Sequence, residues 1–185
     1  MHIRTFIAVA LFLGLASPLI AQSAGASPVP AGGSNQRASL EGCIGQTLFN
    51  GLWRLTVLKS ELVTNPDDED FKNWGITLEV RNGKNATNSP SDSGFDEYPQ
   101  LGFSDGTVLD MATTDAKVQY QKAIFYKDLP PGGVARMTMF YRLEGDDAGK
   151  TPTKLLIAIK PSGPNGKFGY SVSDPSFRVK LDCHG

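Results

Sequence analysis

Side chains that could carry out acid–base or nucleophilic chemistry are sparse in this chain of 185 residues. It has two histidines, His2 near the start and His184 next to the last residue. A Ser-His-Asp or Cys-His arrangement needs an imidazole that a third group holds in a rigid site, and a residue at a terminus does not provide one. Histidine-based zinc and copper sites are excluded for the same reason. We therefore predict no catalytic residues, no enzyme activity and no cofactor.

Carboxylates are plentiful, and the segment Asn65-Pro66-Asp67-Asp68-Glu69-Asp70 concentrates them. Hard cations such as calcium bind clustered oxygens, so Asp67, Asp68 and Asp70 are candidate ligands for an ion. The segment lacks the alternating aspartates and central glycine of a calcium loop. We favour a solvated turn between two strands and predict no metal. A hydrolase that uses two carboxylates stays open as an alternative, because a sequence does not show which acids meet in space.

Aromatic side chains are the other candidates for function. Trp53 is in phase with the apolar residues of its strand, which predicts a core position. Trp74 begins a strand, Phe95 and Tyr98 lie in a polar loop, and Phe140 falls on the polar face of its strand. Exposed aromatics mark partner surfaces, so we select these four residues as binding candidates.

The two cysteines, Cys43 and Cys183, lie near the two ends of the segment that we expect to fold. In an oxidising compartment two cysteines are typical of one disulfide, which would join the first strand to the last. Two free thiols, or a bridge to another chain, are the alternatives.

The N-terminus has the pattern of a secretory signal peptide, which we place at residues 1–26. Arg4 precedes an apolar run, and Ala21 and Ala24-Gly25-Ala26 offer small-residue cleavage sites. The run is too short, and broken too early by Pro18, to suit a transmembrane anchor. We therefore predict a secreted, periplasmic or cell-surface protein without a membrane span after cleavage.

Residues 27–39 are rich in Pro, Gly, Ser and Ala, a composition typical of a flexible tether. Residues 40–185 have the length of one domain. The formal net charge of −1 does not favour a nucleic-acid partner, which would require a clustered basic face.

Short alternating segments separated by turn signals run through the domain, and the clearest is Ile76 to Arg81, which ends at Asn82-Gly83. Lys154 to Lys160 is the most apolar, so we expect it at the centre of a sheet. We also expect Val118 to Tyr126 to be extended. About seven or eight strands predict an all-β antiparallel sandwich.

Several of these segments, taken in order, carry a resemblance to a known family. They are Gly51–Val57 (GLWRLTV), Gly75–Asn82 (GITLEVRN), Leu101–Gly106 (LGFSDG), Leu129–Gly133 (LPPGG), Ala135–Phe140 (ARMTMF) and Leu155–Ile159 (LLIAI). The chain from Cys43 to Asp182 resembles the immunoglobulin-like domains of secreted bacterial proteins, of the type found in immunoprotective extracellular antigens. The resemblance implies an immunoglobulin-like sandwich at a secreted or surface location and carries no catalytic residues over. The loop Gly83–Pro99 and the end-to-end cysteine pair depart from that pattern.

Together these observations predict an exported binding domain whose partner is a protein or a component of the cell envelope. Two other functions remain open. An inhibitor could insert the loop of residues 83–99 into an enzyme cleft, and a carbohydrate-binding module would require an exposed Trp74 or Tyr98 beside a groove.

Overall fold

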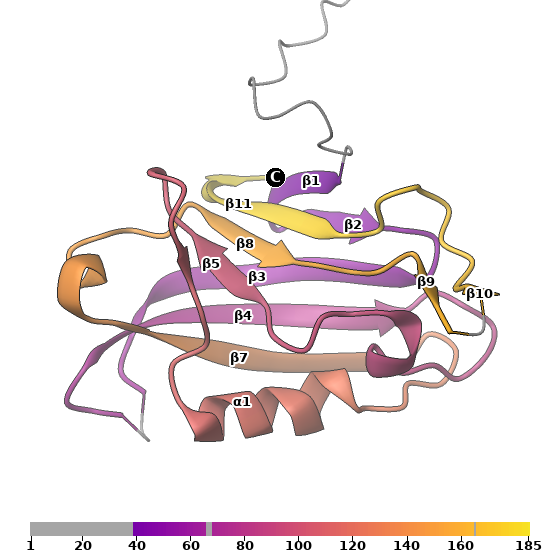
Figure 1. Cartoon of the computed structure of the whole chain (residues 1–185), viewed down its shortest axis with the longest axis horizontal. Coiled ribbons are helices and arrows are strands. Elements are labelled where there is room, and N and C mark those ends of the chain that lie inside the picture. Colours follow the sequence, from indigo (N-terminus) through magenta and orange to yellow (C-terminus); the bar gives the residue numbers. More distant parts are fainter. Residues whose placement is uncertain (1–38, 66–67, 165) are drawn as a thin grey trace, which may run out of the picture. The chain divides into compact units, whose positions relative to one another are not determined.

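Two β-sheets packed face to face form the body of the domain (Figure 1). The structure is a computed structural model, and it describes residues 39–65, 68–164 and 166–185. The proposed signal peptide (1–26), residues 27–38 of the proposed tether and Asp67 lie outside the described residues. One sheet has the strand order β1 (Leu40–Ile44), β11 (Phe177–His184), β8 (Lys154–Ile157), β5 (Gln100–Gly102) and β6 (Val108–Leu109). The other has the order β2 (Thr47–Phe49), β3 (Trp53–Val63), β4 (Lys72–Asn82) and β7 (Val134–Leu143).

Smaller elements lie in the connections between these strands. They are the hairpin β9 (Ser162–Gly163) and β10 (Gly166–Lys167), the 3₁₀ turns η1 (Ser91–Ser93) and η3 (Gly145–Asp147), and the helix α1 (Thr114–Tyr120), continued by the π-helical turn η2 (Gln121–Phe125).

The strand order is that of an immunoglobulin domain. Neighbours β3, β4 and β7 take the places of strands A, B and E, while β11, β8 and β5 take those of G, F and C. Helix α1 follows β6 and lies beside β7, at the place of strand D (Figure 1). The first strand, β1, pairs in parallel with the last, β11. The predicted all-β sandwich is confirmed.

The core lies between the sheets, where alternate residues of each strand point inward. Ile76, Leu78 and Val80 of β4 are buried, as their alternation predicts. Trp53 is fully buried, and β8 lies between β11 and β5 near the centre of its sheet, so both of these predictions are confirmed. No helix in the described ranges has the length and apolarity that crossing a membrane requires.

The expectation that Val118 to Tyr126 is extended is wrong, because this segment is helical. The Thr113 hydroxyl accepts a hydrogen bond from the Ala116 amide (3.1 Å), which caps the start of the helix. Ala116, Tyr120 and Ile124 follow at intervals of four and are all buried, the spacing of one helical face.

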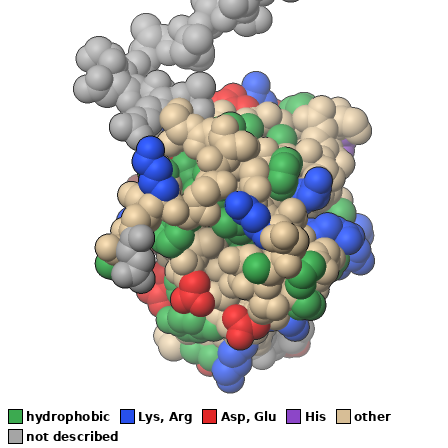
Figure 2. All heavy atoms as spheres, turned by 90° about the vertical axis from the view of Figure 1, so that its right-hand side faces the viewer, with side chains coloured by type: hydrophobic (Ala, Val, Ile, Leu, Met, Phe, Trp, Pro, Cys, Tyr) green, Lys and Arg blue, Asp and Glu red, His purple; other side chains and the backbone are tan. Residues whose placement is uncertain are grey.

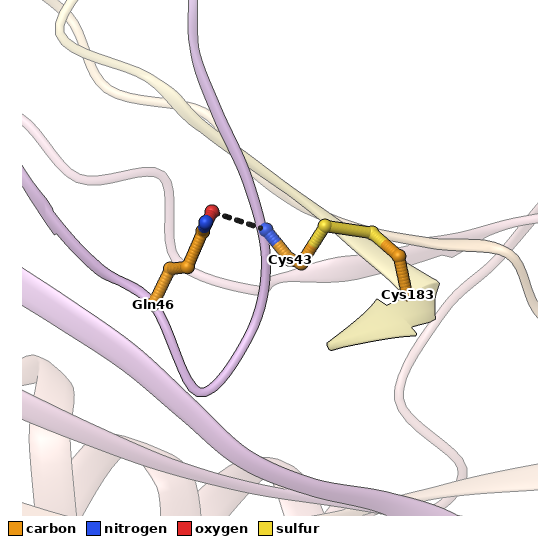
Figure 3. The surroundings of a disulfide bond; sticks show 3 residues. All are labelled: Cys43, Gln46 and Cys183. Atoms are coloured by element: carbon orange, nitrogen blue, oxygen red, sulfur yellow. Dashed lines mark hydrogen bonds between the residues drawn. A yellow bond between two sulfur atoms is a disulfide. The ribbon is translucent and has the colours of Figure 1, made fainter. Parts of the chain in front are cut away.

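Cys43 and Cys183 form the predicted disulfide, which joins β1 to β11 across a sequence separation of 140 (Figure 3). Their Cα atoms lie 5.2 Å apart. The Gln46 side-chain carbonyl accepts a hydrogen bond from the Cys43 amide (2.9 Å), so the turn after β1 is also held at this point (Figure 3).

The loop Gly83–Pro99, which crosses from β4 to β5, is anchored to the core. The Trp53 indole N–H donates to the Ser93 hydroxyl (2.8 Å), and the Tyr170 hydroxyl donates to the Ser93 carbonyl. Phe95 is 6% exposed and meets Trp53 edge-on, with ring centroids 5.9 Å apart. The loop therefore forms part of the packed structure.

Candidate binding groove beside strand β7

The four aromatic binding candidates occupy different environments. The expected exposure of Phe95 is wrong: an isolated bridge to Ile159 draws it into the core. Trp74 is half-buried, and its indole N–H donates to the Ser60 hydroxyl (2.8 Å). Tyr98 and Phe140 are also half-buried. The structure brings only Tyr98 and Phe140 to a shared element, the helical segment α1–η2.

Tyr98 contacts this helical segment through polar groups. Its hydroxyl donates to the Glu97 carboxylate (2.9 Å) and accepts from the Gln121 side-chain amide (2.9 Å). The Lys117 ammonium lies 5.4 Å from the ring centroid. Desolvation, with a further contribution from Glu97, raises the pKa of Tyr98, so the phenol stays protonated at neutral pH.

Phe140 lines an open groove of about 530 Å³ between the helical segment and β7. We call this hollow the β7 groove. Its walls are mostly apolar and come from Gln119, Lys122, Ala123, Met137, Thr138 and Phe140. Helix α1 runs along β7 on the side away from β4 (Figure 1), so the groove follows the outer edge of the four-stranded sheet.

The backbone of β7 is partly unpaired along this edge. The Ala112 amide donates to the Phe140 carbonyl (3.2 Å) from the side away from β4. In an antiparallel pair, alternate residues direct both backbone groups to the same side, so Thr138 and Arg136 also face outward. The helical segment α1–η2 lies beside this edge and covers it, so no strand of the described residues pairs with β7 on this side.

Positive charge lies on both sides of this edge. Lys122 is exposed and forms no ion pair with any other residue in the described part of the chain. Arg136, with 61% of its side chain exposed, donates to the Glu79 carboxylate (2.8 Å). The hydrogen bond from Arg136 is the main reason that the pKa of Glu79 is lowered, so the pair is ionised at neutral pH.

Two features hold the shape of the groove. The Thr138 hydroxyl lies 2.8 Å from that of Thr77 on β4, which fixes its side chain away from this edge. The wider π-helical turn η2, which carries Lys122 and Ala123, follows α1 without a break. Such turns recur at functional sites in proteins.

The acidic loop places its carboxylates in different roles. Asp68, whose side chain is 6% exposed, accepts two hydrogen bonds from the Arg142 guanidinium, one of 2.7 Å to Nε. The guanidinium also stacks on Phe71, 4.1 Å from the ring centroid. Asp70 is exposed. No group of three potential metal ligands occurs among the described residues.

Two smaller hollows lie elsewhere. One of about 380 Å³ lies between the end of β3 and the start of β4. The other, of about 330 Å³, lies beside Tyr170 and is formed mainly by consecutive residues of one loop. The β7 groove is larger than both and more apolar, as binding sites generally are.

Sequence reasoning selected Phe140 but missed the rest of the groove. Lys122 and Ala123 were assigned to a strand, and nothing marked β7 as an edge strand. The available signal was local: Thr113 as a helix cap, followed by apolar residues at intervals of four.

No protein-family model matches the chain. No curated protein matches it either.

The solved structures that are similar to the chain include the following three. An uncharacterised β-sandwich protein from Clostridium difficile is 10% identical, with 82% of this chain and 100% of that chain covered and a TM-score of 0.47. A candidate lipoprotein from Staphylococcus aureus is 14% identical, with 76% of this chain and 90% of that chain covered and a TM-score of 0.41. The yjhA protein from Bacillus subtilis is 15% identical, with 77% of this chain and 99% of that chain covered and a TM-score of 0.44. These likenesses are distant, and none of them bears on what the chain binds.

Proposed function

We propose that this chain is an exported domain that acts by binding, without catalysis, and that it holds a protein partner in the β7 groove. The observation that carries the proposal is the mostly apolar hollow of about 530 Å³ that Met137, Thr138 and Phe140 of β7 form with the helical segment. Binding sites in proteins are generally concave and mostly apolar, with a few polar groups.

Other features support this proposal. The Cys43–Cys183 disulfide is typical of proteins that work in an oxidising compartment. Among the six side chains that line the groove, none is a carboxylate, imidazole or thiol that could act as a general base or nucleophile. The apolar walls and nearby cations suit recognition of a partner.

The inhibitor alternative fits the structure less well. An inhibitory loop must enter the cleft of its target, whereas the loop Gly83–Pro99 is held through Ser93 and Phe95. Deleting the loop would remove these contacts, so such a deletion tests folding as well as binding.

Substitutions at the groove test the proposal without disturbing the core. The full chain, with a tag after Gly185, is expressed in its own host and used to capture partners from the envelope and secreted fractions. Phe140→Ser and Lys122→Glu alter the groove. Phe49→Ser, on the opposite edge strand β2, and Lys127→Glu, just after η2 and outside the groove lining, are matched exposed controls.

We expect one protein to be captured by the wild type and by both controls, and to be lost with both groove variants. Thermal unfolding of each variant checks that the fold is retained. The proposal is wrong if the captured proteins are the same for all five forms, or if folded wild type captures none.

A further inference from the structure

Three arginines lie on the outer face of the four-stranded sheet, which is the face turned away from the other sheet. We propose that Arg54, Arg81 and Arg136 together form a binding site for a phosphate group. This inference goes beyond the proposed function, because none of the three is among the residues that line the β7 groove.

The register of the sheet brings these side chains together. Arg54 of β3 lies directly opposite Arg81 of β4, and Arg136 of β7 lies opposite Glu79, two residues before Arg81. Opposite residues of an antiparallel pair are about 5 Å apart at Cβ, and diagonal ones such as Arg81 and Arg136 are about 7–8 Å apart, within reach of long side chains. All three arginines are exposed. Their guanidinium groups can therefore contact one small anion.

The charges on this face are not balanced. Among the described residues, Glu79 is the only acidic side chain that pairs with these arginines, at 2.8 Å from Arg136 and 3.4 Å from Arg81. Arg54 forms no ion pair in those ranges. Like charges directly opposite each other destabilise a sheet, so the pair of Arg54 and Arg81 is costly unless an anion lies between them.

Figure 2 faces the end of the sandwich where β3 and β7 begin and β4 ends, and it shows Lys and Arg side chains exposed at several places on that end. A surface of this sign attracts anions from solution.

The guanidinium groups are held in place and keep unused donors. That of Arg54 lies 4.2 Å from the ring centroid of Phe49 on β2. That of Arg81 donates to the Gly132 carbonyl (3.3 Å) as well as to Glu79. A guanidinium carries several N–H donors, and those of Arg54 meet no hydrogen-bond acceptor in the part of the chain that is described. An anion would supply the missing acceptors.

A phosphate group fits this arrangement better than a carboxylate does. The fork of one guanidinium occupies both oxygens of a carboxylate, whereas the oxygens of a phosphate group can accept from two forks at once. A phosphate monoester carries a charge of about −1.5 to −2 at pH 7. That charge would offset the surplus left by three arginines and one glutamate.

Titration with inorganic phosphate tests this inference on the purified full chain. Dissociation constants are measured from NMR shifts of the arginine side chains at constant ionic strength, and acetate is the control anion. Arg54→Gln and Arg81→Gln alter the site. Arg178→Gln, on β11 of the other sheet, is the matched control because it removes the same charge elsewhere. Cosedimentation with vesicles of phosphatidylcholine, with or without phosphatidic acid, distinguishes a lipid headgroup from a soluble phosphate.

We expect phosphate to bind saturably and to shift the side-chain signals of Arg54, Arg81 and Arg136, and we expect no saturable binding of acetate. Arg54→Gln and Arg81→Gln should each raise the dissociation constant about tenfold or more, because each removes hydrogen bonds from a charged donor. Arg178→Gln should change it by less than about twofold, because its charge is distant and screened. Thermal unfolding checks that each variant retains the fold.

Equal binding of phosphate and acetate overturns the proposal, and so does equal binding of phosphate by wild type and both site variants. Absence of saturable phosphate binding by the folded wild type also overturns it. Vesicle binding that requires both phosphatidic acid and Arg54 would identify a lipid headgroup as the source of the phosphate, and phosphate binding without vesicle binding would identify a soluble one. Both of these results support the site, and neither depends on capture of a protein through the β7 groove.

Discussion

The indole N–H of Trp53 donates a hydrogen bond of 2.8 Å to the hydroxyl of Ser93, although 40 residues separate them in the chain. Trp53 starts β3 and is fully buried, and Ser93 ends the 3₁₀ turn η1 in the loop between the sheets. The Ser93 hydroxyl donates in turn to the backbone carbonyl of Ser89 (2.7 Å). One side chain thus satisfies a buried donor and holds the loop closed.

Ser93→Ala should therefore destabilise the fold. It removes the hydroxyl that accepts the hydrogen bond of the buried Trp53 N–H, a cost of about 1–3 kcal/mol in the free energy of unfolding. Urea unfolding followed by tryptophan fluorescence measures the change. Ser104→Ala, at an exposed turn, is the control and should stay within about 0.5 kcal/mol of wild type. Equal stability of the two variants would contradict the role assigned to Ser93.

Two glycines with positive φ should respond differently to alanine. Gly51 has a φ of 98°, and a Cβ there would clash with the backbone nitrogen of Ser171. Gly106 has a φ of 86° in a turn with open space around it. Gly106→Ala should cost about 1 kcal/mol from backbone strain alone. Gly51→Ala adds a steric clash and should cost more, as thermal unfolding can show. A smaller loss for Gly51→Ala would contradict the close approach of the two loops.

The disulfide should be a large source of stability, because it closes most of the domain into one loop. The chain-entropy relation gives about 5 kcal/mol for a closure of this length, an upper figure in practice. The double variant Cys43→Ser with Cys183→Ser should unfold at a markedly lower urea concentration than oxidised wild type. Addition of a reductant should shift wild type toward the double variant and leave the variant unchanged. Unfolding of oxidised wild type at the same urea concentration as the double variant would contradict this account.

Asp105 should make stability depend on pH at the acid end. Its pKa lies below the ordinary value of 3.8, because the Thr107 hydroxyl and amide and the Lys150 ammonium all favour the carboxylate. A lowered pKa in the fold adds stability above the ordinary value, and this stability is lost as pH falls through it toward the folded value. Wild type should therefore exceed Asp105→Asn in stability at pH 7, and urea midpoints of the two should converge as pH decreases toward 2. Parallel curves would refute this assignment.

The strands could be predicted well from the sequence, because a strand that buries one face alternates apolar and polar residues. In β4 the alternation of Ile76, Leu78 and Val80 with polar residues indicates both the strand and its inner face. The helix from Thr114 to Phe125 was missed because its seven-residue α-helical part is short and its apolar residues also fit a partly alternating strand.

The groove was beyond sequence reasoning for a different reason. Lys122 and Thr138 become neighbours only through the packing of the helical segment on β7. Whether a strand lies at the edge of its sheet depends on which strands pair with it, and no local pattern records that. Phe95 was wrongly expected to be exposed because its neighbours in the sequence are polar. Its contact with Trp53, which buries it, depends on how the loop folds back on the core.

Hydrogen exchange along β7 tests the central claim most directly. In the free chain the amides of Arg136 and Thr138 should exchange much faster than those of Met137 and Met139, which face β4. When a captured partner is bound, the account predicts added protection at Arg136 and Thr138, which border the groove, and little change at Met137 and Met139. Bound ligand that leaves the exchange of Arg136 and Thr138 unchanged, with protection at another surface, would contradict it.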